Sequence, residues 1–409
     1  MNSTPILSPA NILLPPYEPF SPLWEKWAVI ACDQFTSEPE YWKEAADIAG
    51  GAPSALSLIL PEAYLRTPEE DARRGMIRGA MEKCAGWLRA CPDSMIYLRR
   101  TLPDGRVRTG LVGKIDLECY DYGKGSASAV RATEATVLER IPPRVSIRRE
   151  ALLELPHVML LMEDTVGLFS YLQEHSAEYA CAYDFDLMLG GGHAAGFLLT
   201  GSALVGVTER IAAYESCGGL VYAVGDGNHS LAAARAQYMA LKESLGGAAL
   251  SHPARYALAE VVALGDPALE FEPIYRVVSG CDPAGLLAAL PLSGEGDGAQ
   301  RVRALTASGE RAFSFREPTH ALTVGSLQNA LDEFLATHPG ASCDYIHGEA
   351  SLRALARREG CVGFLFDGME KEQLFPYVRA HGTLPRKTFS MGEARSKRYY
   401  IEARRITEA

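Results

Sequence analysis

The sequence lacks several features that would each place it in a particular class of protein. No apolar run is long enough to span a membrane, and the first ten residues have neither the basic head nor the apolar core of a secretory leader. The net charge of −11 argues against a large nucleic-acid-binding surface. We therefore expect a cytoplasmic protein that acts on a small molecule without nucleic-acid or membrane partners, either as a monomer or as a homodimer.

Two common catalytic motifs are also missing. The chain has neither the GxSxG turn of many serine hydrolases nor the GxxxxGK[ST] phosphate loop. Its nine cysteines are scattered, and no pair has the short spacing of a zinc knuckle or a redox dithiol. We expect the cysteines to pack as small apolar residues.

The composition is that of a globular protein, with 409 residues of which 47% are hydrophobic and 22% are charged. Strand-like and helix-like apolar patterns follow one another along the chain, which predicts an α/β fold with mixed sheets and flanking helices. We expect a larger core domain at 1–285 that carries the functional site. A smaller α/β domain at 286–383 and a C-terminal segment, 384–409, that returns to the core complete the prediction.

The most informative segment is residues 220–238, whose pattern predicts a buried strand, a sharp glycine turn (residues 225–230) and a helix that begins directly after it. Such a helix start points unpaired N–H groups and the positive end of the helix dipole at one spot, which suits an anion. We expect Asp226 and His229 to be catalytic, with Asp226 also a metal ligand. The residues of the turn expected to bind phosphate or nucleotide are Gly225, Gly227, Asn228 and Ser230. The alternative is that these residues only cap the helix and shape the turn.

A second glycine-rich segment, the glycine loop (residues 190–193), interrupts an apolar stretch. Gly190, Gly191 and Gly192 allow the backbone to approach a ligand closely, and His193 follows them. We expect all four to contribute to the phosphate site, against the alternative of a flexible surface turn.

A polar group lies further towards the N-terminus and contains Arg131, Thr133, Glu134 and Arg144. Arginine offers bidentate bonds to phosphate or carboxylate groups, so Arg131 and Thr133 are expected to bind phosphate, Glu134 to be catalytic and Arg144 to bind the substrate. The alternative is a network of surface ion pairs, which stabilises a protein little.

Two isolated residues complete the candidates for substrate binding. Asp33 follows the apolar segment 27–32, read as a strand, and α/β proteins often place functional carboxylates at strand ends. Lys387 lies in a short basic segment that can approach a phosphate. The alternatives are a turn residue at Asp33 and a solvated tail at Lys387.

Several blocks of the sequence resemble a microbial family known as domain of unknown function 1015, and the resemblance spans nearly the whole chain. These blocks are Ala28–Ser37, Val130–Glu134, Arg140–Arg144, Glu154–His157, Gly225–Ser230, His252–Tyr256 and Leu384–Ser390. Members of the larger family are often encoded near serine-biosynthesis genes, which implies serine or phosphoserine as the substrate.

The glycine turn alone is distantly similar to an Asp-Gly-His-His-Arg element of ParB and sulfiredoxin-like proteins, including free-serine kinases, where it holds nucleotide phosphates. Asp226, Gly227 and His229 match this element. Asn228 replaces the first histidine and Ser230 replaces the arginine. Arg131 or Lys387 would therefore have to bind the phosphate in place of that arginine.

These residues together favour a phosphoryl-transfer enzyme that acts on a small hydroxy amino acid or its phosphate, with ATP or ADP and Mg²⁺ as cofactors. One alternative is a non-catalytic regulatory protein that binds a phosphorylated metabolite. Another is a metal-dependent hydrolase with Asp226, His229 and His193 as ligands.

Overall fold

The computed structural model describes residues 5–36, 38–65, 67–136, 139, 141–155, 157–294 and 298–408, with the backbone alone at positions 33 and 62. The chain forms two compact units, one of residues 1–269 with 393–409 and the other of residues 270–392. Both units combine helices with sheets, which confirms the expected α/β class.

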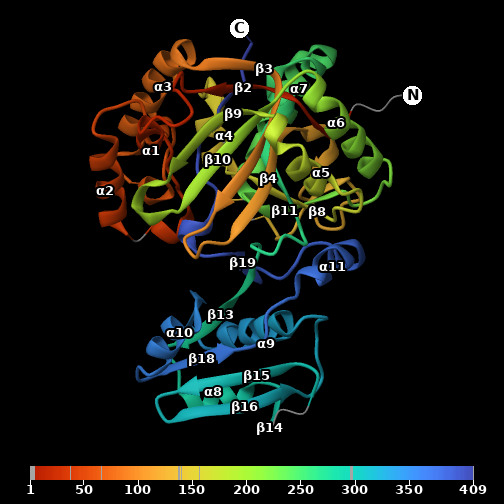
Figure 1. The fold of residues 1–409 in the computed structure, drawn as a ribbon. Coiled ribbons are helices and arrows are strands. Elements are labelled where there is room, and N and C mark those ends of the chain that lie inside the picture. The colour runs from red at the N-terminus through yellow and green to blue at the C-terminus, as the bar shows by residue number, and fades with distance from the viewer. Residues whose placement is uncertain are drawn as a thin grey trace. The chain divides into compact units, whose positions relative to one another are not determined.

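The first unit is built on an 11-stranded sheet with helices on both faces (Figure 1). Its strands are β1 (Leu7–Ser8), β2 (Ala10–Leu14), β3 (Arg89–Thr101), β4 (Val107–Asp116), β5 (Tyr120–Asp121), β6 (Val130–Ala132), β8 (Met159–Met162), β9 (Ala180–Asp186), β10 (His193–Leu199), β11 (Tyr222–Asp226) and β12 (Tyr256–Ala263). The central order is β5-β6-β11-β8-β12-β4-β3-β10-β9. The pairs β5–β6, β6–β11 and β8–β12 are parallel and the rest are antiparallel, so the sheet is mixed.

Two hydrophobic cores lie against the two faces of this sheet. Along β3, Ile96 and Leu98 belong to one core, whereas Met95 and Tyr97 belong to the other, because side chains alternate between the faces of a strand. The helices of the unit are α1 (Leu23–Trp27), α2 (Pro39–Ala49), α3 (Glu70–Trp87), α4 (Ile141–Arg149), α5 (Leu168–Glu174), α6 (Ser202–Glu215) and α7 (Asn228–Leu245). Helices α1 to α3 cover the first core, and α5 to α7 cover the second.

The apolar segment 27–32 is not the strand that its composition predicts. Helix α1 ends at Trp27, Val29 makes an isolated bridge to Tyr400, and a short 3₁₀ helix spans Asp33–Phe35. This segment is apolar because it is buried in the first core, and a short apolar run does not distinguish that situation from a buried strand.

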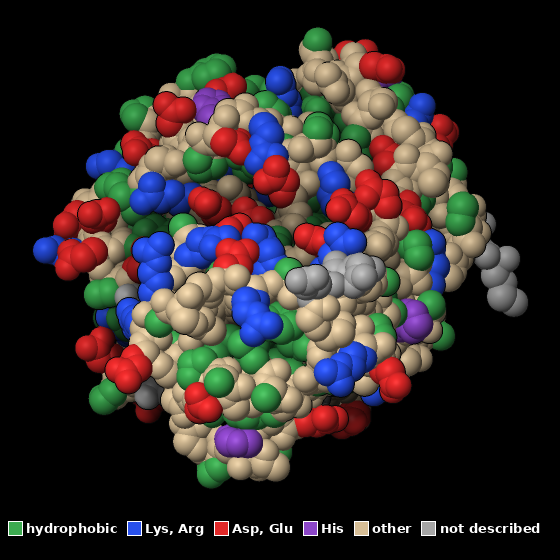
Figure 2. All heavy atoms as spheres, turned by 90° about the horizontal axis from the view of Figure 1, so that it is seen from below, with side chains coloured by type: hydrophobic (Ala, Val, Ile, Leu, Met, Phe, Trp, Pro, Cys, Tyr) green, Lys and Arg blue, Asp and Glu red, His purple; other side chains and the backbone are tan. Residues whose placement is uncertain are grey.

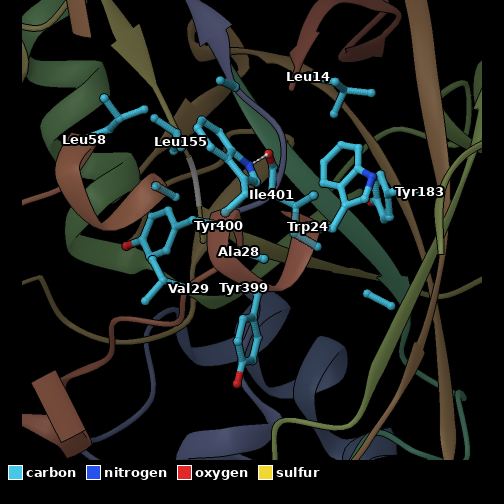
Figure 3. Close-up of a cluster of buried hydrophobic side chains, with 14 of the residues drawn as sticks. Leu14, Trp24, Ala28, Val29, Leu58, Leu155, Tyr183, Tyr399, Tyr400 and Ile401 are labelled. Atoms are coloured by element: carbon cyan, nitrogen blue, oxygen red, sulfur yellow. Dashed lines mark hydrogen bonds between the residues drawn. The ribbon is translucent and has the colours of Figure 1, made fainter. Parts of the chain in front are cut away.

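The C-terminal segment (residues 393–409) packs into the first core. Tyr400 and Ile401 lie among side chains from the N-terminal part of the chain, including Ala28 and Val29, and Figure 3 shows this cluster. The indole nitrogen of Trp27 donates a hydrogen bond to Ile401 O at 2.7 Å. Beyond it, β20 (Arg404–Arg405) pairs with β7 (Leu153–Glu154).

The second unit is a seven-stranded antiparallel sheet with its own core. Its elements are β13 (Phe271–Ser279), α8 (Pro283–Ala289), β14 (Leu292–Gly294), β15 (Arg301–Thr306), β16 (Gly309–Phe315), α9 (Thr323–Thr337), β17 (Ser342–His347), α10 (Glu349–Ala356), β18 (Cys361–Leu365), α11 (Leu374–His381) and β19 (Phe389–Met391). Strand β13 lies within the expected 1–285 core, yet it pairs with β17, β18 and β19, so this unit begins at residue 270.

The surface charges, the helix lengths and the cysteines of the structure agree with the composition of the sequence. Figure 2 shows acidic and basic side chains interspersed over one face. Within the described ranges, no helix combines the length and apolar character needed to cross a bilayer. All nine cysteines are free thiols.

Candidate active site

The glycine turn has the predicted strand–turn–helix geometry. Strand β11 ends at Asp226, and α7 begins at Asn228. The pairing of β11 with β8 shifts between Val224 and Asp226, so Gly225 forms a β-bulge. Gly227 has φ = 84°, and a Cβ there would lie 3.1 Å from Val158 Cα. Glycine is therefore required at 227 by both its backbone conformation and its surroundings.

The start of α7 presents backbone donors that the helix itself does not satisfy. Its first helical bond runs from Leu231 N to Gly227 O, so the N–H groups of Asn228, His229 and Ser230 have no acceptor within the helix. Gly227 stands at the N-cap and supplies no side chain. Capping therefore does not account for the polar residues of this turn.

Two of the predicted phosphate-binding residues, Thr133 and Asn228, make hydrogen bonds that hold the turn together. The hydroxyl of Thr133 donates to Val224 O at 2.6 Å, and Thr133 N donates to the side-chain oxygen of Asn228 at 3.3 Å. Both side chains are buried. They fix the segment after β6 against the first turn of α7.

Asp226 is paired with a lysine from the distant C-terminal segment. Lys397 Nζ lies 3.1 Å from Asp226 Oδ2, and the other carboxylate oxygen accepts from Gly227 N at 2.8 Å. The Lys397 side chain is 11% exposed, against 31% for Asp226. A nearly buried cation thus lies beside the start of a helix. The lysine charge and the helix dipole both favour binding of an anion there.

A histidine outside the predicted set also contacts the turn. His157 Nε2 lies 3.4 Å from Ser230 Oγ, and His157 Nδ1 lies 2.6 Å from the hydroxyl of Tyr400. Burial raises the pKa of Tyr400, the charges of Cys32 and Asp226 raise it further, and Arg144 lowers it. Helix α4, which carries Arg144, packs against α7, and the expected role of Arg144 in substrate binding stays a prediction.

The remaining predicted residues of the first unit fall into three cases. Arg131 lies on β6, next to β11, and its Nε donates to Ser128 O at 2.7 Å. Glu134 follows β6 and His229 is the second residue of α7. Both are partly buried, and both have interaction partners. The side chain of Asp33 lies outside the described part of the chain.

Lys387 lies in the second unit, where its backbone oxygen accepts from Arg276 Nη1 at 3.0 Å. Its expected role at the phosphate site stays a prediction.

Other parts of the protein pack closely against the glycine loop. A Cβ at Gly191 would lie 2.1 Å from the hydroxyl of Tyr399, and one at Gly192 would lie 2.2 Å from Thr101 O. Figure 3 shows Tyr399 directing its hydroxyl away from the hydrophobic cluster, and this hydroxyl donates to Met188 O at 3.2 Å. These two glycines therefore have a packing role, because they allow the C-terminal segment and β3 to approach.

His193 does not join the glycine turn. Its Nε2 lies 2.8 Å from Asp184 and its Nδ1 lies 2.8 Å from Asp186, both on the neighbouring strand β9. Four strands of the sheet separate β10 from β11. Among the residues that the structure describes, no group of three His, Cys, Asp or Glu side chains is placed to hold a metal ion. The ligand set Asp226, His229 and His193 of the hydrolase alternative is therefore not assembled.

The C-terminal segment lies between the two glycine regions, and buried charges anchor it. Arg398 donates to Glu260 at 2.7 Å and to Glu402 at 2.6 Å. Burial alone would lower the pKa of Arg398, but the two carboxylates raise it above its usual value. Arg100 Nη2 donates to Arg395 O at 3.0 Å, and Arg108 Nη1 donates to Ser396 O at 3.1 Å.

Sequence reasoning missed three residues of this site, namely His157, Lys397 and Tyr400. His157 stood out only as part of the Glu154–His157 block, and Lys397 and Tyr400 only as part of the segment expected to return to the core. A signal was present, since a lysine, an arginine and two tyrosines follow one another at 397–400.

The profile of the family described as "Protein of unknown function (DUF1015)" matches residues 15–334. The chain belongs to this family. The DUF1015 match covers the glycine turn, the glycine loop and His157, whereas Lys397 and Tyr400 lie beyond it. No curated protein matches the chain.

Solved structures resemble this DUF1015 chain only weakly. SbnI from Staphylococcus aureus, with a C-terminal truncation, is 10% identical at a TM-score of 0.36, covering 69% of this chain and 82% of that one. Free serine kinase in complex with AMP is 11% identical at 0.38, covering 72% and 90%. A conserved hypothetical protein from Pyrococcus furiosus is 11% identical at 0.35, covering 72% and 94%. Such low scores support no argument about function, and the ParB and sulfiredoxin-like likeness of the glycine turn stays a prediction.

Proposed function

We propose that this protein transfers a phosphoryl group to or from a small hydroxy amino acid, with serine and phosphoserine as the first candidates. The observation that carries the proposal is the Asp226–Lys397 pair at the start of α7. A phosphate held there would receive bonds from the N–H groups of the first helical turn and charge from Lys397.

Each charged group has a defined task in this proposal. A phosphate that binds Lys397 would replace Asp226 as its partner, which leaves the Asp226 carboxylate available for Mg²⁺ of an ATP or ADP complex. Magnesium would neutralise charge on the transferred group. His229 would act as general base, and Glu134 would activate the substrate hydroxyl. Arg131 would stabilise developing charge, with Arg144 and Asp33 on the substrate.

The direct test incubates the purified protein with serine and ATP or ADP, or with phosphoserine and the corresponding nucleotide, in the presence of Mg²⁺. Phosphorus NMR then follows formation of the new phosphate ester or nucleotide. We expect turnover in the wild type and a large loss in Lys397→Met.

The matched control is Lys83→Met, which removes an exposed lysine on α3. Full activity in Lys397→Met would contradict the proposal, as would the absence of any product. Saturable binding of the same ligands without product would instead support the regulatory, non-catalytic alternative.

A further inference from the structure

Ser230, His157 and Tyr400 form a hydrogen-bonded chain that the proposed function does not use. The Ser230 hydroxyl oxygen lies 3.4 Å from His157 Nε2, and His157 Nδ1 lies 2.6 Å from the Tyr400 hydroxyl. The three residues come from α7, the connection between β7 and β8, and the C-terminal segment. A hydroxyl, an imidazole and a group that orients the imidazole are the parts of an activated serine nucleophile.

The surroundings favour this arrangement over a purely structural one. Ser230 is the third residue of α7 and not its N-cap, so helix capping does not explain the direction of its side chain. Gly227 also faces His157, since a Cβ there would lie 3.5 Å from the imidazole Cδ2. Ser230 and His157 are both partly exposed, whereas Tyr400 is buried. Solvent therefore reaches part of Ser230 and part of His157, whereas the orienting phenol lies in the interior.

The tautomer that activates Ser230 follows from the positions of the three groups. His157 Nε2 accepts a proton from Ser230 only if Nδ1 carries the other ring proton and donates it to the Tyr400 oxygen. Burial raises the pKa of Tyr400, so the phenol stays neutral at physiological pH. A neutral phenol orients the ring without fixing it as an imidazolium ion. The distance of 3.4 Å is loose, as is common for a nucleophile and base before substrate binds.

We propose that Ser230 is a nucleophile that takes up a phosphoryl group covalently, with His157 as its base and Tyr400 as the residue that positions His157. The oxygen of Ser230 forms a bond to phosphorus while the bond from phosphorus to the departing oxygen breaks, and that oxygen keeps the electron pair. The serine proton passes to His157 Nε2. In the second step an acceptor hydroxyl attacks the phosphorus of phosphorylated Ser230 and releases its proton to the solvent. The bond from phosphorus to the Ser230 oxygen breaks, and that oxygen takes back the proton from His157 Nε2.

The identity of the transferred group rests on the proposed function, whereas the reactivity of Ser230 does not. Backbone N–H groups at the start of α7 and the nearby Lys397 would stabilise charge on the phosphoryl oxygens during both steps.

The test uses a fluorophosphonate, in which serine oxygen attacks phosphorus, the phosphorus–fluorine bond breaks and fluoride departs. The full-length protein is treated with the probe, and intact mass and peptide mapping locate the adduct. We expect one adduct on the wild-type protein, on Ser230, and we expect the Ser230→Ala variant to lack this adduct. Ser244→Ala is the matched control, because Ser244 is an exposed serine of the same helix whose hydroxyl bonds Leu241 O.

The role of the base and of the positioning residue is read from the pH dependence of labelling. The wild-type rate should rise with pH as one group loses its proton, and His157→Gln should be slower by about 100-fold with a flat profile. His157→Asn serves as a second variant if the first does not fold. Tyr400→Phe should retain a rising profile at a reduced rate.

Absence of an adduct on the wild-type Ser230 would overturn the inference, as would an unchanged rate in a folded His157 variant. Phosphoryl transfer that persists in Ser230→Ala would overturn the covalent route while leaving the proposed function intact. Labelling of Ser230 in a protein that transfers no phosphoryl group would remove the proposed function and keep the nucleophile.

Discussion

The two glycine-rich segments of this chain look alike in sequence and differ in what surrounds them. In the glycine turn, Gly225 forms a bulge and Gly227 a left-handed corner, and together they expose the start of α7. In the glycine loop, the hydroxyl of Tyr399 and a carbonyl oxygen of β3 occupy the positions that side chains at Gly191 and Gly192 would need. The difference teaches that glycine marks a close approach of atoms, and that only the neighbours decide whether a ligand or the protein itself makes that approach.

The largest expected effect is on the rate of phosphoryl transfer, and it tests which of the two glycine regions contributes to catalysis. Asp226→Asn should reduce phosphoryl transfer by roughly 100-fold or more, because it removes a charged group from the reacting site. His193→Gln should leave the rate near that of the wild type, since its imidazole bonds Asp186 and Asp184 on β9, and four strands separate β10 from β11. Initial rates at saturating substrate measure both. Equal losses in the two variants would erase the distinction.

The next effect concerns the segment that touches both regions. Arg398→Met removes the buried cation that bonds Glu402 and leaves the buried Glu260 with Arg108, 3.9 Å away, so it should lower the free energy of unfolding by about 3–5 kcal/mol. Hydrogen exchange should increase at both glycine regions. Arg106→Met, which removes an exposed pair with Asp104, is the control and should change neither quantity. Faster exchange in one region alone would show that the segment does not join them.

Substitutions within the glycine loop test its packing role. Gly192→Ala should lower the free energy of unfolding by about 2–4 kcal/mol, because Thr101 O lies 2.2 Å from the new Cβ and φ is 86°. Gly190→Ala is the matched control, with a similar φ of 69° but no contact shorter than 3.5 Å, and should lower it by about 1 kcal/mol. Urea denaturation measures both. Similar losses would mean that backbone conformation alone requires glycine here.

The smallest effect is a pH dependence at the far end of the C-terminal segment. Burial alone would raise the pKa of Glu154, but Arg404 and Arg148 hold it below its usual value. Its stabilising contribution is therefore present at neutral pH, above the pKa of an unfolded glutamate, and is lost as pH falls through the lowered folded pKa. The difference in Tm between the wild type and Glu154→Gln should shrink on acidification. A constant difference down to pH 3 would show that the charge of Glu154 does not stabilise this end.

The parts of the site that could be predicted from the sequence are local. Residues 220–238 carry their own strand, turn and helix signals within a short stretch, so the structure of the glycine turn follows from neighbouring residues. The α/β class follows in the same way from alternating apolar patterns. The prediction of a strand at 27–32 was wrong, because a segment buried by a distant tail has the same apolar composition as a strand buried in a sheet.

The partners of the turn could not be predicted, because each contact joins residues far apart in the chain. Lys397 lies 171 residues after Asp226, and Tyr400 lies 243 residues after His157. No periodicity links such positions. The same holds for β13, whose pairing with strands up to residue 391 assigns it to the second unit.

The return of residues 393–409 to the first unit has a consequence for biosynthesis. A ribosome makes residues 1–269, then the whole of the second unit, and only afterwards the segment that carries Lys397, Arg398 and Tyr400. Domains generally fold as they emerge, so the second unit can be complete while the first still exposes the apolar surface that Tyr400 and Ile401 later cover. Nascent chains halted within residues 270–392 would therefore depend on chaperones, and they would remain without the lysine and the phenol of the candidate active site.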